Sequence, residues 1–128
     1  MIADTDIQRA AKELVERHGY NALAAAREHV PSNRLCIAGV GRESTIETIR
    51  ATKRAADLGV DAVLVRTPSF YKVLLTPEVF VAHYTAVADA SPVPVLLYNF
   101  TAVTGVTLPV EVVSTLAAHP NIVGLGLN

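Results

Sequence analysis

The sequence has no tryptophan and a single cysteine, Cys36, among its 128 residues. One cysteine excludes an internal disulfide and a metal cluster built on several thiolates. The formal net charge is −1 with no block of basic residues, which argues against nucleic acid or an acidic membrane surface as the main partner. No apolar run reaches the ~18 residues of a membrane span, and the start does not resemble a signal peptide. We therefore expect a cytoplasmic protein without a cofactor, a membrane partner or a nucleic-acid partner.

Apolar residues are plentiful, at 51% of the chain, and they gather in short runs. Four such runs predict strands at about Leu35–Val40, Ala62–Val65, Val95–Tyr98 and Ile122–Leu125. They begin roughly 30 residues apart, and each is followed or preceded by a helical pattern. Strands and helices that alternate in this way form β-α units with parallel strands and right-handed crossovers. The sequence therefore predicts an α/β fold with about four parallel strands in sequence order across the sheet.

Several helix starts are marked by capping residues. Ser44 and Glu47 form a capping box, and Thr76 precedes a proline in the first helical turn. The helix after Thr76 has an apolar stripe that includes His83, so we expect this histidine to be packed rather than catalytic. The Gly-x-Gly of residues 39–41 lacks the third glycine of a dinucleotide fingerprint, and it predicts a tight turn rather than a phosphate site.

The first residues carry their own pattern. Residues 5–18 have apolar side chains at helical spacing, and a second, alanine-rich helix is expected from Asn21 to His29, before Pro31. We expect residues 1–24 to form a helical segment, whose origin the sequence leaves open. Residues 25–128 then form the α/β domain.

The run Val95 to Leu97 organises the rest of the chain. It is bounded by Pro94 and by a segment rich in threonine and glycine, and it is typical of a strand buried on both faces. Tyr98 follows at the carboxyl end of this strand, where parallel α/β folds place their chemistry. Tyr98 is therefore a candidate catalytic residue. The alternative is a core tyrosine whose hydroxyl is satisfied internally.

Five strings carry a family resemblance. They are IAGVGRESTIETI, AVLVRTPSFYK, LTPEVFVAHYTAVAD, LLYN with a following Thr-Gly, and HPNIVG. In this order, from about Ala25 to Gly124, they resemble the dihydrodipicolinate synthase/N-acetylneuraminate lyase family. Its members are (β/α)8-barrel class I aldolases that bind pyruvate or related 2-oxo acids as a lysine Schiff base. The resemblance implies a partial TIM barrel, because a closed barrel needs at least about 200 residues.

The resemblance also assigns positions in the site. Tyr98 matches the family's proton-relay tyrosine, whereas the Schiff-base lysine falls on Gly126 and a second relay tyrosine falls on Phe70. The arginine that holds aspartate semialdehyde in the synthases falls on Val103, which fits a 4-hydroxy-2-oxoglutarate aldolase-like member better. The family's proline after its Tyr-Asn pair falls on Thr101. The family's carboxylate clamp has no counterpart in these residues.

Two interpretations of function remain open. In the first, the chain is a truncated aldolase, inactive alone, whose intact relatives act on a 2-oxo acid such as pyruvate. In the second, it is a non-catalytic α/β module that forms a homo-oligomer through the open edges of its sheet. A small-ligand binder of flavodoxin type is a third idea, but no phosphate or flavin loop is visible.

Overall fold

The computed structural model describes residues 22–127 of the chain. The chain forms two compact units, residues 1–34 and residues 35–128. In the first unit, α2 (Ala22–His29) corresponds to the helix expected before Pro31. The helix expected over residues 5–18 lies outside the described residues. The expected division of the chain after residue 24 therefore stays a prediction.

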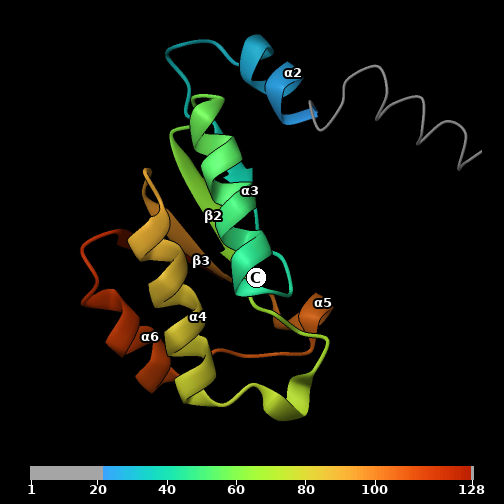
Figure 1. The fold of residues 1–128 in the computed structure, drawn as a ribbon, viewed down its shortest axis with the longest axis vertical. Coiled ribbons are helices and arrows are strands. Elements are labelled where there is room, and N and C mark those ends of the chain that lie inside the picture. Colours follow the sequence, from blue (N-terminus) through green and yellow to red (C-terminus); the bar gives the residue numbers. More distant parts are fainter. Residues whose placement is uncertain (1–21, 128) are drawn as a thin grey trace, which may run out of the picture. The chain divides into compact units, whose positions relative to one another are not determined.

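The second unit is built on a four-stranded parallel sheet. Its strands lie in the order β1-β2-β3-β4, and every neighbouring pair is parallel (Figure 1). They are β1 (Ile37–Gly39), β2 (Ala62–Arg66), β3 (Val95–Asn99) and β4 (Ile122–Leu127). The predicted fold class and strand order are confirmed. β1 is shorter than the expected run from Leu35 to Val40, and β4 extends further than expected.

Three helices connect these strands, and the first two begin at the predicted caps. They are α3 (Thr45–Asp57), α4 (Pro77–Ala90) and α6 (Val110–Ala117). Ser44 Oγ accepts the N–H of Glu47 at 3.0 Å, and Thr76 Oγ1 accepts the N–H of Val79 at 3.3 Å. Two short pieces, η1 (Lys72–Leu74) and α5 (Thr101–Thr104), lie in the loops that follow β2 and β3.

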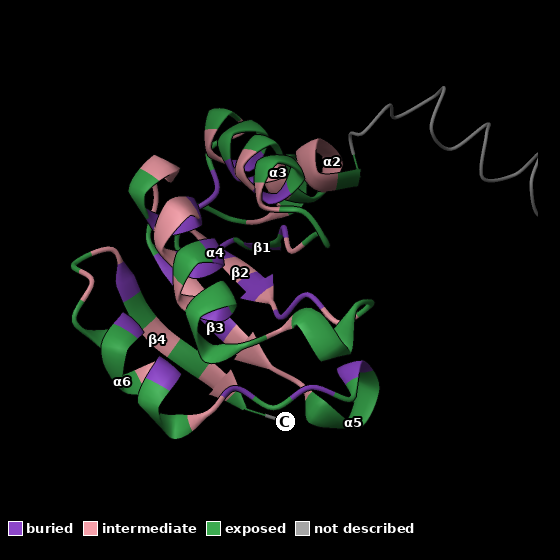
Figure 2. Ribbon diagram, turned by 60° about the horizontal axis from the view of Figure 1, so that its bottom comes forward, coloured by how far each residue is buried: buried purple, intermediate pink, exposed green. Residues whose placement is uncertain are grey.

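The core lies between the helices and one face of the sheet (Figure 2). Alternate strand residues point into it and are at most 2% exposed: Val63, Val65, Val95 and Leu97. Tyr84 of α4 is fully buried there, and its hydroxyl donates to the carbonyl of Val65 at 3.2 Å. Burial raises the pKa of Tyr84 well above its ordinary value. His83 is also buried, as predicted, with Nδ1 2.8 Å from Thr45 Oγ1, and burial lowers its pKa.

Within the second unit, no described helix covers the other face of the sheet, which we call the bare face. Leu64 and Leu96 point to it and are only half-buried, and Ile37 is 47% exposed. The expectation that the run Val95 to Leu97 is buried on both faces is therefore wrong for Leu96. The physical reason is that α3, α4 and α6 all pack on one side, so alternate residues of each strand meet different surroundings.

Candidate functional site

Tyr98 lies near the carboxyl end of β3 on the bare face, at the centre of a row that crosses three strands. It pairs in register with Arg66 of β2 on one side and with Gly126 of β4 on the other. A Cβ atom at Gly126 would lie 3.1 Å from Tyr98 Cδ2, so a side chain at position 126 would stand against the tyrosine ring. The ring also packs on Phe100, with centroids 5.4 Å apart. The two positions that the resemblance singles out, 98 and 126, are thus neighbours.

A hollow of about 320 Å³ opens beside Tyr98 at the carboxyl ends of β1 to β3. Its walls come from Gly39, Gly41, Arg42, Leu64, Arg66 and Tyr98. Gly41 allows two segments to approach closely here, because a Cβ atom at this position would meet Arg66 Cγ at 2.7 Å and the Arg66 backbone nitrogen at 2.8 Å. Gly41 thus permits a close approach of backbone to backbone. The expected tight turn is wrong, because Gly39 ends β1 and the next two residues continue without a turn.

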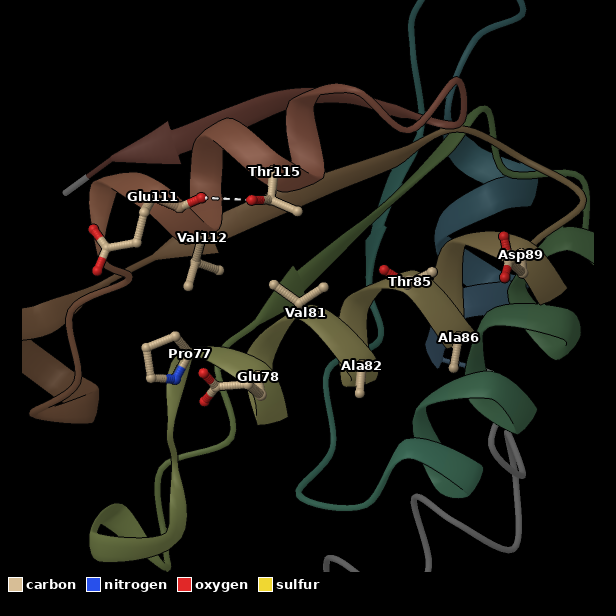
Figure 3. Close-up of a pocket in the computed structure, with 10 residues that line it drawn as sticks. All are labelled: Pro77, Glu78, Val81, Ala82, Thr85, Ala86, Asp89, Glu111, Val112 and Thr115. Carbon is tan, nitrogen blue, oxygen red and sulfur yellow. Dashed lines mark hydrogen bonds between the residues drawn. The ribbon is translucent and has the colours of Figure 1, made fainter.

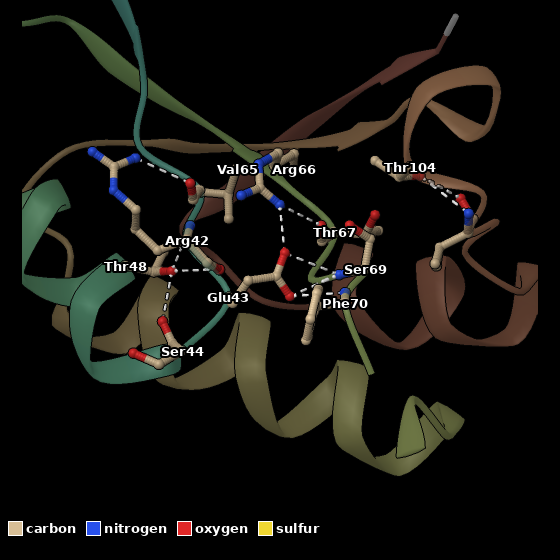
Figure 4. A network of polar contacts seen from close by, with 12 residues as sticks. Arg42, Glu43, Ser44, Thr48, Val65, Arg66, Thr67, Ser69, Phe70 and Thr104 are labelled. Atoms are coloured by element: carbon tan, nitrogen blue, oxygen red, sulfur yellow. Dashed lines mark hydrogen bonds and ion pairs between the residues drawn. The ribbon is translucent and has the colours of Figure 1, made fainter. Parts of the chain in front are cut away.

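Glu43 is the centre of a polar network at this end of the sheet (Figure 4). Its carboxylate accepts the backbone N–H groups of Ser69 and Phe70, each at 3.0 Å, and Arg66 Nη1 at 3.1 Å. Burial acts to raise the pKa of Glu43, but the hydrogen bonds from Phe70, Ser69 and Arg66 outweigh it and hold the pKa below its ordinary value. Arg66 Nη1 also donates to the carbonyl of Thr67 at 3.1 Å. The network fastens the loop after β2 to the segment that precedes α3.

Sequence reasoning missed the roles of Glu43 and Arg66. The two residues are distant in the sequence and meet because the carboxyl ends of neighbouring parallel strands lie at one edge of the sheet. The sequence did hold one signal for this pair. Glu43 comes shortly after the first predicted strand and Arg66 directly after the second, so both were expected near the carboxyl ends of parallel strands. Phe70, at the family's second tyrosine position, is 74% exposed and packs edge-to-face on Tyr71, with centroids 4.9 Å apart.

The lysines of the described residues lie elsewhere. Lys72 is exposed in η1, and its ammonium donates to the carbonyl of Ser69 at 2.7 Å. Its aliphatic stem passes over Gly105, where a Cβ atom would meet Lys72 Cε at 3.0 Å. Lys53 lies exposed on α3, and Lys12 falls outside the described residues. Neither of the two described lysines belongs to the row of Arg66, Tyr98 and Gly126.

A second hollow lies on the opposite side of the sheet, between α4 and α6 (Figure 3). It measures about 600 Å³ and has an apolar floor that includes Val81 and Val112. Three carboxylates, those of Glu78, Asp89 and Glu111, stand on its rim. The residues that line this groove include no lysine, cysteine or histidine, so its size does not make it the candidate site for aldolase chemistry.

Within residues 22–127, no three side chains of the metal-ligating types come together, and no helix is long and apolar enough to cross a membrane. The chemistry available at the carboxyl end of the described strands is therefore that of Tyr98, Arg66 and Glu43. These side chains can relay a proton and neutralise an anion. They do not include an amine nucleophile.

A parallel sheet with its functional side chains at the carboxyl ends of the strands is the arrangement of a β/α-barrel enzyme. The model of the dihydrodipicolinate synthetase family matches residues 14–126, so the chain belongs to this family. The predicted family membership is confirmed, and the match begins earlier than the expected residue 25.

Two curated relatives illustrate the family's activities. The chain is 45% identical over 103 residues to a 4-hydroxy-tetrahydrodipicolinate synthase of Exiguobacterium sp., which covers 80% of this chain and 34% of the relative. It is 41% identical over 119 residues to a probable mitochondrial 4-hydroxy-2-oxoglutarate aldolase of Emericella nidulans, with 88% and 38% covered. The chain therefore spans little more than a third of these relatives' length.

A solved structure gives the same result for the fold. The dihydrodipicolinate synthase of Acinetobacter baumannii, crystallised with pyruvate, superposes with a TM-score of 0.80 at 39% identity. The superposition covers 88% of this chain and 38% of that protein. The described strands are thus part of a TIM barrel, as predicted.

Proposed function

We propose that this chain is an aldolase-family segment that forms no Schiff base and does not turn over substrate by itself. The observation that carries the proposal is the pairing of Tyr98 with Gly126, which has no side chain where the family resemblance puts the lysine. The ligand class that we assign to intact relatives is a 2-oxo acid such as pyruvate. This assignment is supported by the pyruvate complex of the Acinetobacter baumannii relative.

Class I aldolase chemistry has three requirements. A lysine amine must be desolvated enough to be neutral and attack a ketone, a relay must move protons near that carbon, and donors must hold the substrate carboxylate. Tyr98 satisfies the second requirement in our proposal, and Arg66 is the cation nearest to it in register. The first requirement is unmet among the described residues, because Lys53 and Lys72 are exposed and lie outside the row of Tyr98. A relay without a nucleophile performs no step.

Reduction with borohydride tests this proposal. A Schiff base between pyruvate and a lysine is trapped by borohydride as a stable secondary amine, which raises the mass of the protein. We expect the mass of the chain to be the same with and without pyruvate during reduction, since Gly126 carries no amine. An adduct that appears only with pyruvate and maps to Lys72, or to any other lysine, contradicts the proposal.

The variant Gly126→Lys extends the same experiment. At a dilution at which the chain is a single copy, the new amine would stand on the bare face, exposed to solvent, and would keep an ordinary pKa of about 10.4, so it would be mostly protonated at pH 7. We therefore expect no turnover of 2-oxo acids by this variant. Turnover by Gly126→Lys would mean that the described strands alone provide the burial and the carboxylate donors.

A second candidate function is self-association as a non-catalytic module. It is favoured by apolar side chains at both outer strands of the described sheet. Leu35 before β1 is 76% exposed, and Leu127 of β4 is 70% exposed. Exposed edges of this kind are templates for pairing with another chain.

A further inference from the structure

We propose that two copies of the 128-residue chain close into one eight-stranded barrel, in which β4 of each copy pairs in parallel with β1 of the other. The bare faces of the two sheets would then line the barrel interior. The proposal rests on the second candidate function and adds to it a defined partner, a second copy, and a defined geometry. The borohydride result expected for the unmodified chain does not depend on it, because Gly126 carries no amine whether or not two sheets close.

The first argument comes from the two outer strands. Cys36 accepts the N–H of Asp61 and Val40 donates to Leu64, so these residues turn their backbone groups towards β2. Residues that alternate with them, Ile37 and Gly39, direct their N–H and carbonyl groups to the open side of β1. β4 forms the other border of the described sheet and runs in the same direction. The unpaired backbone groups of β1 in one copy can therefore form a parallel pair with those of β4 in another copy.

The second argument is curvature. The described sheet superposes on a barrel enzyme with a TM-score of 0.80 while covering 38% of that protein. Four parallel strands are half of the eight in such a barrel. A two-fold axis along the barrel generates the other four with the same direction and order. This arrangement pairs all the edges, whereas pairing β1 with the partner's β1 would leave both β4 strands open.

The third argument is the composition of the bare face. Gly39, Leu64, Leu96 and Gly124 pair in register and form one row across it. Leu96 leans over Gly124, with Cδ2 2.7 Å from where a Cβ atom at that glycine would be. Barrel interiors are filled by such layers of side chains, with large residues packed over small ones. Each copy contributes one row, and the two rows supply four leucines to a common interior.

Charge does not oppose this closure. In the four described strands Arg66 is the one charged side chain, and it stands at the carboxyl end with its guanidinium held by Glu43. The row that would form the interior is free of charged side chains. The net charge of −1 per chain gives little repulsion between copies.

Sedimentation equilibrium combined with hydrogen exchange tests the proposal on the unmodified chain. We expect a species of twice the 13.6 kDa chain mass that does not grow further at high micromolar concentration, because closure uses both edges. The amides of Ile37 and Gly39 should exchange at least about tenfold more slowly in the dimer than at high dilution, since β4 of the partner would accept them. Neither measurement depends on a variant that has to fold.

A matched pair of variants then assigns the contact surface. Ile37→Asp puts a carboxylate on the bare face at the border strand, and Ile46→Asp puts the same group on the exposed surface of α3. We expect Ile37→Asp to weaken the dimer by about a hundredfold or more, because closure buries one unpaired carboxylate from each copy. Ile46→Asp should leave the dimer unchanged. Circular dichroism checks that both variants fold.

The opposite results are equally defined. A monomer at high micromolar concentration, or growth into assemblies larger than two, overturns the proposal. So does a dimer in which the Ile37 and Gly39 amides exchange as fast as at high dilution, or a dimer that is weakened by Ile46→Asp and not by Ile37→Asp. The borohydride experiment has a separate readout, so failure of the barrel closure is distinguishable from failure of the proposed lack of activity.

Discussion

The two faces of the sheet use similar residues and meet different surroundings. On the helix-covered face, Val65 and Leu97 are at most 2% exposed, and the hydroxyl of the buried Tyr84 donates to the carbonyl of Val65. On the bare face, their immediate neighbours Leu64 and Leu96 are only half-buried. An apolar side chain gains free energy in proportion to the area that it removes from water. The described residues therefore hold their structure mainly through one face, and the other face is apolar without being covered.

The largest difference between the faces is expected from truncating adjacent leucines. Leu97→Ala should lower the free energy of unfolding by about 3 kcal/mol, because it leaves a cavity in a packed core. Leu96→Ala should lower it by about 1 kcal/mol or less, since that side chain is partly hydrated already. Urea unfolding followed by circular dichroism, with both variants at the same low concentration, measures the two values.

If Leu97→Ala and Leu96→Ala lower the free energy of unfolding equally, the two faces of the sheet are not differently covered. If copies close into a barrel, the effect of Leu96→Ala should grow with protein concentration, because its side chain then lies in an interior. The effect of Leu97→Ala on each copy should not depend on concentration. The pair of variants therefore separates a face that is covered within the chain from one that is covered by a partner.

Much of the fold could be predicted from local patterns. The spacing of the apolar runs gave the four parallel strands, and the capping residues Ser44 and Thr76 marked where α3 and α4 begin. These signals are local, so they survive without knowledge of the rest of the structure. The partial exposure of Leu96 could not be predicted. A continuous run of apolar residues indicates a strand that is buried on both faces, but it does not show which other element, if any, covers each face.

The candidate site was predicted less completely. Tyr98 was identified from its position at a strand end and from the resemblance, and its role stays a prediction. Glu43, Arg66 and the loop at Ser69 belong to segments that are distant in the sequence, and only the parallel pairing of β1 with β2 brings them together. Their contacts depend on side-chain geometry at one edge of the sheet, which no short sequence pattern encodes.

An intermediate effect is expected at this edge, where the bare face ends in a polar network. Glu43→Gln removes the carboxylate that accepts from Ser69, Phe70 and Arg66. Because the glutamate is partly exposed, we expect a loss of only about 1 kcal/mol and faster exchange of the Ser69 and Phe70 amides. Hydrogen exchange of these two amides against pH measures the effect.

The pH dependence follows from the lowered pKa of Glu43. A carboxyl group with a lowered pKa in the folded state stabilises that state fully above its ordinary pKa of 4.5, and the stabilisation is lost as the pH falls below this value. Protection of the loop amides should therefore decrease on acidification in the unmodified chain. It should vary much less in Glu43→Gln, and a parallel acid dependence in the variant would assign the effect to another group.

The smallest effect is expected from adding a methyl group at two glycines of the bare face. At Gly39 nothing lies within 4 Å of a Cβ atom, so Gly39→Ala should be neutral or stabilise by up to about 0.5 kcal/mol, as the unfolded chain loses freedom. At Gly126 the new methyl would lie 3.1 Å from Tyr98 Cδ2, and the ring must move by a few tenths of an ångström. Gly126→Ala should therefore cost up to about 0.5 kcal/mol. It should shift the NMR signals of the Tyr98 ring, whereas Gly39→Ala should not. Unshifted Tyr98 signals in Gly126→Ala would mean that position 126 does not face the tyrosine. The position at which the family resemblance puts the lysine would then not lie beside Tyr98, and our structural argument for the missing Schiff base would be lost.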